Sequence, residues 1–321
     1  MLLRKSSILA ACGTSMLLTG CVGSSGTTST TSLTSYASDI GANSEIESTG
    51  VAVEAALTVG GSSTTVGTAV TDTNTKVVLS YDSAGELSGA EIYTSNESFV
   101  LGDGAAVTVY SGFGPDAGEL TVVDSGDQEV NVGAIVDPDQ SGWDYQTFGF
   151  WARGVNGTTD PSNPPRYGAG SWGLKTDGAS IPTSGSNVQF TGTAGGAYHD
   201  NATGYDFLVY SDAILTADFV NRSVTISTDN AERVGIINGL SNQSSNGVLI
   251  SSADSGLEFD GTLTYSAATN ELSGAIANGA INPTLSGTAR GYFYGPNAEE
   301  IGGVFSLTGS AGDYVGAFGA Q

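Results

Sequence analysis

The sequence predicts an all-β protein built from antiparallel strands, and three observations support this fold class. Period-two alternation of apolar and polar residues dominates, and no long stretch has helical periodicity. Ser, Thr and Gly are abundant, with 47 Gly, whereas charged residues make up only 13% of the chain. Asn156–Gly157 is a hairpin candidate. Together these features indicate a barrel or a sandwich of half-buried strands.

The charge balance excludes one class of partner. Asp and Glu number 33 against 9 Lys and Arg, which gives a formal net charge of -24. A surface of this sign repels phosphate backbones, so we expect no nucleic acid partner. With 321 residues, 39% of them hydrophobic, the chain is long enough to bury a sizeable core.

The N-terminus predicts export and a lipid anchor. Arg4 and Lys5 precede a short apolar stretch, as in a secretory signal peptide over residues 1–20. The segment Leu-Thr-Gly-Cys that ends at Cys21 resembles the lipobox of bacterial lipoproteins. The resemblance implies cleavage before Cys21, lipidation of its thiol and acylation of the new amino group with chains such as palmitate. The alternative is an ordinary signal peptide followed by a chance cysteine.

A flexible tether is predicted over residues 21–40. Residues 22–38 are rich in Ser, Thr and Gly, and the first charge after the signal is Asp39. Such a composition cannot bury enough apolar area to offset the entropy lost on ordering. Cys12 leaves with the signal and Cys21 is consumed by lipid, so no disulfide is expected.

Three segments show the clearest strand patterns. Leu257–Tyr265 places apolar residues and glycine on one face, with acids and threonines on the other. Leu285–Phe293 sets Ser286, Thr288, Arg290 and Tyr292 opposite its apolar face. Residues 223–227 alternate in the same way.

Two pairs of segments within the chain are similar in sequence. Tyr81–Ala90 resembles Tyr265–Ala275, and Phe113–Leu120 resembles Tyr294–Ile301 in the same order. A duplicated strand unit and chance recurrence of Gly, Ala and Ser in hairpins both explain it.

The C-terminal half resembles the β-barrel domain of the transferrin-binding protein B-like surface lipoproteins. Six segments carry the resemblance. They are Asp144–Trp151 for the first barrel strand, Ile181–Gly185, Val188–Gly192 and Leu215–Phe219 for the following strands, and Gly291–Phe305 and Tyr314–Ala320 for the closing strands. The resemblance implies a small β-rich handle domain over residues 41–142 and a closed, antiparallel, eight-stranded β-barrel over residues 143–321. It also implies that the terminal strand pairs with residues 145–151. The alternative is a generic glycine-rich β-protein.

The same resemblance implies a function. A lipid-anchored protein of the outer membrane, facing outward, would capture an iron source, either haem or an iron-carrier protein, for a partner TonB-dependent outer-membrane receptor. The chain is about one lobe long, whereas the receptor protein of that family has two. The alternatives are a surface adhesin or coat lipoprotein with no uptake role, and an exported enzyme that acts on polysaccharide.

No catalytic site or resident cofactor is predicted. His199 is the single histidine, and no Gly-x-Ser-x-Gly occurs, so a serine hydrolase is not expected. Asp137–Asp144 begins like a calcium loop, but Phe148 stands where the bidentate glutamate should be. We therefore expect an acidic turn between handle and barrel, and no metal site.

Ligand contact is expected in the loop Val155–Trp172, which is long and carries three prolines. Arg166, Tyr167 and Trp172 belong to the residue types that dominate binding hot spots. The alternative is a plain surface loop with Trp172 packed into the barrel. For haem, only His199 or a tyrosine is left as an axial ligand, and the interpretation that we favour for His199 is a solvated loop residue.

Overall fold

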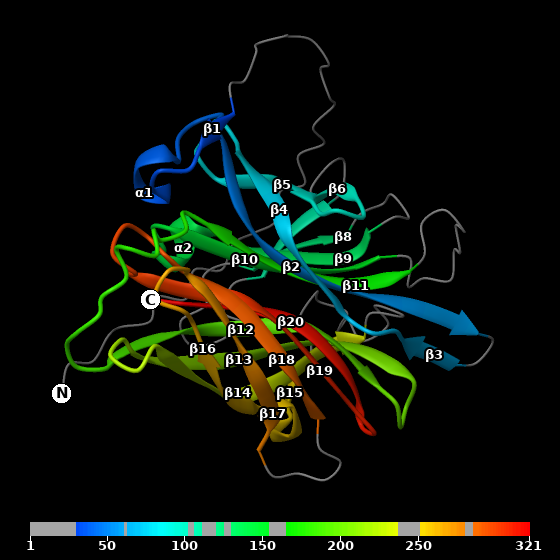
Figure 1. Cartoon of the computed structure of the whole chain (residues 1–321). Coiled ribbons are helices and arrows are strands. Elements are labelled where there is room, and N and C mark those ends of the chain that lie inside the picture. The colour runs from blue at the N-terminus through cyan, green and yellow to red at the C-terminus, as the bar shows by residue number, and fades with distance from the viewer. Residues whose placement is uncertain are drawn as a thin grey trace, which may run out of the picture.

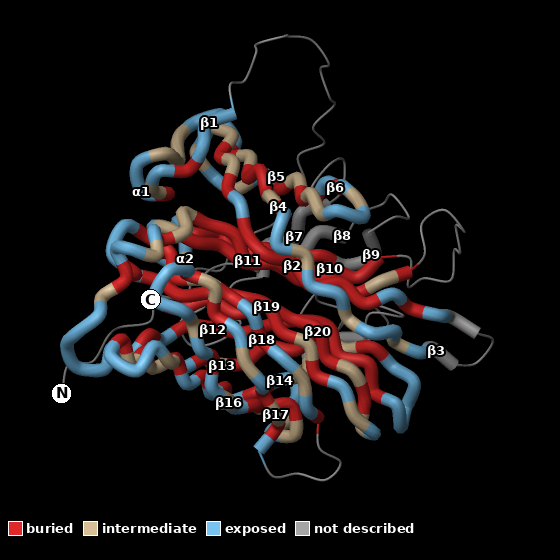
Figure 2. Tube along the Cα trace, viewed as in Figure 1, coloured by how far each residue is buried: buried red, intermediate tan, exposed pale blue. Residues whose placement is uncertain are grey.

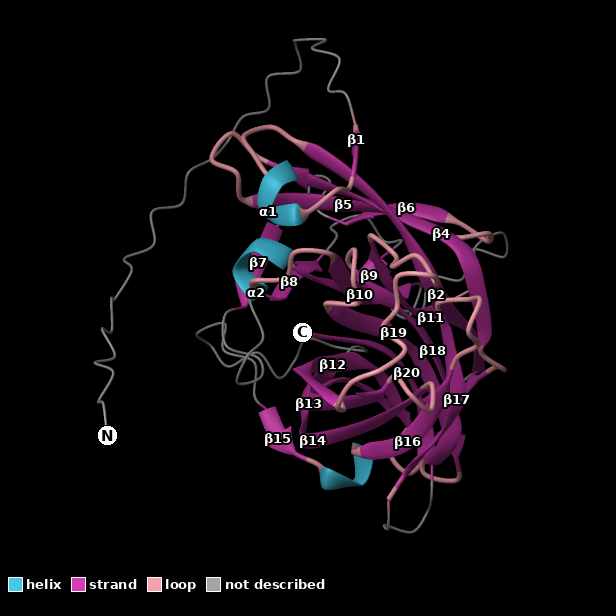
Figure 3. Cartoon of the chain, turned by 60° about the vertical axis from the view of Figure 1, so that its left-hand side comes forward, coloured by secondary structure: helices cyan, strands magenta, loops and turns pink. Residues whose placement is uncertain are grey.

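The computed structural model describes residues 30–60, 63–101, 106–110, 120–124, 130–153, 165–236, 251–279 and 285–321. These residues form two stacked β-structures, a curled sheet and a closed barrel (Figure 1). Strands dominate the described chain, and the few helices are single turns in the connections (Figure 3). This architecture confirms the predicted fold class of a β-rich handle followed by an eight-stranded barrel.

The curled sheet, which we call the handle sheet, has eleven strands among the described residues. Its strand order is β6-β5-β4-β2-β11-β10-β9-β8-β7, and β1 and β3 also pair with β2. The strands are β1 (Thr31–Ser32), β2 (Glu45–Gly60), β3 (Ser63–Val66), β4 (Val70–Tyr81), β5 (Leu87–Tyr93), β6 (Ser98–Leu101), β7 (Ala106–Tyr110), β8 (Leu120–Asp124), β9 (Val130–Val136), β10 (Gln146–Arg153) and β11 (Arg166–Gly173). The sheet curls enough to bring β6 into contact with β9.

The barrel consists of eight antiparallel strands in the order β13-β12-β20-β19-β18-β17-β16-β14, and it closes where β14 pairs with β13. Its strands are β12 (Val188–Asp200), β13 (Tyr205–Asp218), β14 (Ser223–Ile236), β16 (Phe259–Thr264), β17 (Glu271–Asn278), β18 (Leu285–Tyr294), β19 (Glu300–Gly309) and β20 (Gly312–Ala320). The short β15 (Ser251–Ala253) pairs with one end of β14. The helical turns are α1 (Tyr36–Asp39), α2 (Pro138–Ser141) and the 3-10 turn η2 (Ser255–Leu257).

Alternation positions the barrel core as predicted. Leu263, Leu285 and Phe293 are buried in one cluster that fills the barrel. Their strand neighbours Thr262, Thr264 and Ser286 are exposed on the outer face. Buried residues accordingly run through the inside of the barrel and through the layer between barrel and handle sheet (Figure 2).

The prediction for the first barrel strand is wrong. Residues 146–153 form β10, which pairs with β9 and β11 in the handle sheet. The terminal strand β20 pairs instead with β12 and β19. The barrel therefore begins at β12, and the expected boundary at residue 143 is too early because β10 and β11 precede the barrel.

The acidic turn from Asp137 does not lie between handle and barrel, where the sequence predicted it. Its helix α2 joins β9 to β10 within the handle sheet, and the Asp137 carboxylate caps α2 by accepting from the Asp139 N–H at 3.1 Å. Within the described ranges, no group of three or more His, Cys, Asp or Glu is arranged to hold a metal ion. No helix in these ranges is long and apolar enough to cross a membrane.

The segments that are similar in sequence lie in hairpins of the two β-structures. Residues 81–90 lie in the β4–β5 hairpin, and residues 265–275 lie in the β16–β17 hairpin. Residues 294–301 form the β18–β19 turn, whereas most of 113–120 lies outside the described residues. Asn156–Gly157 lies outside them too.

Handle sheet and barrel share a core. One buried cluster joins Phe148 and Tyr167 of the handle sheet to Ala197 and Val304 on the outer face of the barrel. Gln146 adds hydrogen bonds from its amide nitrogen to the Ile301 and Ala320 carbonyls, at 3.1 and 2.9 Å. Gly302 permits this approach, because a Cβ there would lie 2.1 Å from the Gln146 Oε1. The two structures thus pack as one body.

Candidate ligand-binding site

Part of the predicted binding loop is a strand. Residues 154–164 lie outside the described residues, and the chain forms β11 from Arg166 onward. Arg166, Tyr167 and Trp172 are therefore strand residues, because β11 pairs along its whole length with β10 and β2.

Trp172 is a core residue of the handle sheet. Its side chain is fully buried, and its indole N–H donates to the Thr75 hydroxyl at 3.1 Å. The ring stacks on Trp151 with 6.4 Å between centroids. Trp172 packs in the core of the handle sheet. The alternative interpretation of the sequence, in which Trp172 packs into the barrel, is therefore wrong.

Arg166 lies in a mostly buried cluster of ion pairs. Its guanidinium is 3.9 Å from Glu54 and 3.8 Å from Glu97, and Arg153 pairs with Glu97 as well. Asn96 donates to Glu54 at 2.6 Å. Burial raises the pKa of Glu97 to about 7, against the opposing effect of the two arginines. The Arg166 side chain keeps 13% exposure, so among the three predicted residues it alone reaches solvent.

Tyr167 belongs to a buried polar network between the two β-structures. Its hydroxyl donates to the Oδ1 atom of Asp206. This Asp206 oxygen also lies 2.7 Å from the His199 Nδ1. Burial is the main cause that raises the pKa of Tyr167, and the negative charge of Asp206 raises it further. The network connects β11 to β12 and β13. Because His199 is only 1% exposed, a haem iron in solvent cannot reach it in this conformation.

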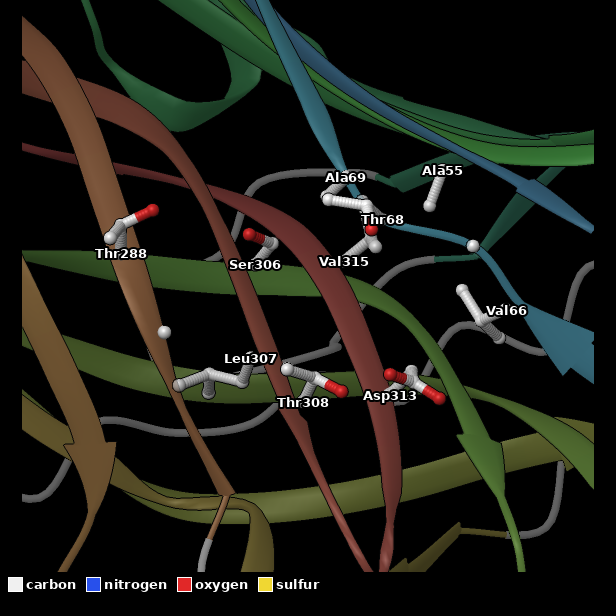
Figure 4. Close-up of a pocket in the computed structure, with 12 residues that line it drawn as sticks. Ala55, Val66, Thr68, Ala69, Thr288, Ser306, Leu307, Thr308, Asp313 and Val315 are labelled. Atoms are coloured by element: carbon white, nitrogen blue, oxygen red, sulfur yellow. The ribbon is translucent and has the colours of Figure 1, made fainter.

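Beside this network, an open cavity of about 330 Å³ separates the end of the handle sheet from the barrel (Figure 4). Its floor is the outer face of β18, β19 and β20, and includes Thr288, Ser306, Thr308, Asp313 and Val315. Its roof is β2 and the connection from β3 to β4, and includes Ala55, Val66, Thr68 and Ala69. Hydroxyl groups and small apolar side chains thus face one space.

Strand register explains how the floor is built. Thr288, Ser306 and Val315 are successive cross-strand partners, and Thr308 is the partner of Asp313 in the next row. Directly opposed residues have Cβ atoms about 5 Å apart, so each row presents neighbouring groups to the cavity. Sequence alternation had placed Thr288 on an outward face. It gave no signal that residues 66–69 cover that face, because this contact joins segments more than 200 residues apart.

Comparison with known proteins finds one family whose sequence profile matches the barrel residues. Residues 181–321 match the sequence profile of the C-lobe and N-lobe β-barrels of transferrin-binding protein B. No curated protein matches the chain. The match covers β12 to β20, which are the strands that close the barrel.

Solved structures with a similar fold include three binding proteins. A transferrin-binding protein B variant from Haemophilus parasuis is 13% identical, with TM-score 0.39, over 78% of this chain and 54% of its own. The Neisseria meningitidis isotype 1 protein is 16% identical, with TM-score 0.37, over 78% and 51%. The N-lobe of lactoferrin-binding protein B from Moraxella bovis is 12% identical, with TM-score 0.31, over 68% and 80%. The chain spans about half the length of the first two.

Proposed function

We propose that the protein captures an iron-carrier protein at the bacterial surface, because residues 181–321 match the sequence profile of transferrin-binding protein B barrels. The observation that carries the proposal is the closed barrel from β12 to β20, which lies within the matched residues. The proposal assigns the protein a binding role and no catalytic step.

The N-terminal sequence supports the location. Signal peptide and lipobox predict a chain anchored through Cys21, which lies outside the described residues, and a tether before the first strand. Several acyl chains hold a protein on a membrane far more firmly than one. We place the anchored protein on the outer face of the outer membrane, where a TonB-dependent receptor would receive the iron.

The anchor has its own test. Mass spectrometry of the membrane fraction should find Cys21 as the acylated first residue, and Cys21→Ala should release the protein from that fraction. Unmodified Cys21, or a Cys21→Ala protein that stays in the membrane, contradicts the lipoprotein assignment.

Arg166 is the residue we propose for ligand contact. The strand that carries it is fixed on both faces, by Tyr167 toward the barrel and by Trp172 in the handle core. A rigid strand presents a side chain at little entropic cost, and Arg is frequent at binding hot spots. Tyr167 and Trp172, although predicted as contacts, would then support Arg166 from within the protein.

Lipid-free protein from residue 22 onward would be titrated with immobilised transferrin, immobilised lactoferrin and free haem. Arg166→Ala should weaken protein binding about tenfold, the range of a hot-spot residue. Arg290→Ala is the matched control, because Arg290 also pairs with a glutamate, at 2.9 Å from Glu271, but lies on the exposed barrel face. Thermal melting of both variants verifies folding.

The results separate the candidate functions. Binding of either carrier protein supports capture, and equal affinity in the two arginine variants moves the contact away from Arg166. Haem binding that survives His199→Ala would agree with the burial of His199 and would exclude it as the axial ligand. If neither carrier nor haem binds to the folded protein, the iron-capture proposal fails and the adhesin or coat alternative remains.

A further inference from the structure

The cavity between the β3–β4 connection and the barrel has the properties of a small-molecule site. Its volume of about 330 Å³ lies at the lower end of the range for ligand pockets, about 300 to 1,000 Å³. It is open to solvent, since Thr68, Thr288 and Thr308 on its rim are exposed. A molecule the size of one or two sugar rings is therefore the largest that it encloses.

The polar groups of the cavity are available to a ligand. Among the described residues, no hydrogen bond joins the side chains of Thr288, Ser306, Thr308 or Asp313 to another protein group. Hydroxyl groups both donate and accept hydrogen bonds, so three of these side chains suit a ligand that carries hydroxyls. A hydroxylated ligand would give these groups hydrogen-bond partners.

Charge determines the rest of the ligand. Asp313 is half-buried, and it is the single ionisable residue among the described side chains that line the cavity. No lysine or arginine in that lining would neutralise an anion, and the net charge of -24 repels one further. Thr308, the strand partner of Asp313, adds an acceptor beside the carboxylate. An ammonium group placed there would contact both.

The apolar part of the lining fits the carbon face of a ring. Ala55 and Val315 are buried beside the cavity, and Val66 and Ala69 of the roof are partly buried. These side chains are short, so a flat ring fits between roof and floor without displacing a larger group. We infer that this cavity binds a small hydroxylated organic cation, and that a hexosamine is the simplest molecule of that class.

Three sugars of similar size test the inference. D-glucosamine with its amine protonated, neutral D-glucose and anionic D-glucuronate would each be titrated by calorimetry and by ligand-observed NMR. Glucosamine should bind most tightly, glucose about tenfold more weakly and glucuronate not measurably, because a charge-assisted hydrogen bond is roughly twice as strong as a neutral one. A glucosamine trisaccharide distinguishes a free sugar from the end of a glycan chain as the natural form of the ligand.

Two pairs of variants connect the binding to the cavity. Asp313→Asn should lower glucosamine affinity about tenfold and leave glucose affinity within about twofold, whereas Asp260→Asn on exposed β16 should change neither. Ala69→Leu fills the cavity from its roof and should abolish binding. Ala275→Leu, on the exposed face of β17, is the control of equal volume.

The inference is wrong if the folded protein binds none of the three sugars. It is also wrong if glucuronate binds as tightly as glucosamine, or if Ala69→Leu and Ala275→Leu bind glucosamine equally. The result is independent of carrier capture, because carrier binding is measured without any added sugar.

Discussion

Tyr167 shows how single side chains join the two β-structures. Its ring packs in the shared apolar cluster, while its hydroxyl donates to Asp206 on the barrel. If the buried carboxylate loses a hydrogen-bond donor, the free-energy cost of removing it from water is no longer offset. A buried apolar group carries no such cost. The contact between handle sheet and barrel therefore depends on polar partners as well as on apolar area.

Removing this hydroxyl should destabilise the protein. We expect Tyr167→Phe to lower the free energy of unfolding by about 1 to 3 kcal/mol, because Asp206 loses a donor in a buried site. Tyr205→Phe, on a side chain 51% exposed, should stay within about 0.5 kcal/mol of the parent. Urea unfolding measures both, and equal stability of the two variants would contradict a structural role for the Tyr167 hydroxyl.

At the scale of elements, Glu300 at the start of β19 fixes the segment that leads into β10. Its buried carboxylate accepts the backbone N–H of Asp144 at 2.6 Å and that of Tyr145 at 3.2 Å. Burial raises the pKa of Glu300 from its ordinary 4.5 to about 7, although these hydrogen bonds act in the opposite direction. This contact between barrel and handle sheet is therefore sensitive to pH.

The sign of the pH effect follows from the raised pKa. The stability that proton uptake by Glu300 contributes is complete below pH 4.5, declines as the pH rises and is lost above about pH 7. The parent should therefore lose about 3 kcal/mol more than Glu300→Gln between pH 4.5 and 7.5, since one pKa unit corresponds to about 1.4 kcal/mol. Glu299→Gln, on the exposed neighbour, is the control. Parallel pH profiles for parent and Glu300→Gln would contradict this assignment.

The terminal strand should be essential to folding. β20 pairs with β12 on one side and β19 on the other, so deleting residues 310–321 removes two ladders and opens the barrel. This loss exceeds the roughly 5 to 15 kcal/mol by which a typical domain is stable. The truncated chain should show no cooperative melting. A transition near the parental temperature would refute the closed barrel.

At the scale of the whole molecule, the shared cluster predicts that handle sheet and barrel unfold together. All three tryptophans lie in the handle part of the chain, at positions 143, 151 and 172, whereas strands of both structures contribute to far-UV circular dichroism. We expect denaturation curves from tryptophan fluorescence and circular dichroism to coincide, as two-state unfolding requires. Separate midpoints would show that the barrel folds independently of the handle sheet.

Several features of the protein could be predicted from the sequence alone. Alternation identified both faces of the strands around Leu263 and Leu285, because a strand with one buried face must alternate with period two. The closing segments around Tyr314 carried the resemblance to the barrels whose sequence profile matches residues 181–321. These are local properties, since each depends on residues adjacent along the chain.

Only the tertiary structure decided which sheet each strand joins. β10 is buried along its whole length, because the handle core covers one face and the barrel covers the other. The backbone hydrogen bonds that pair strands are the same for every sequence, so the residues of β10 could not distinguish β20 from β9 as its neighbour. The positions of Tyr167 and Trp172 could not be predicted for a similar reason, since large aromatic side chains suit a core and a binding surface equally. The cavity beside Asp313 exists only because the β3–β4 connection lies over strands at the other end of the chain.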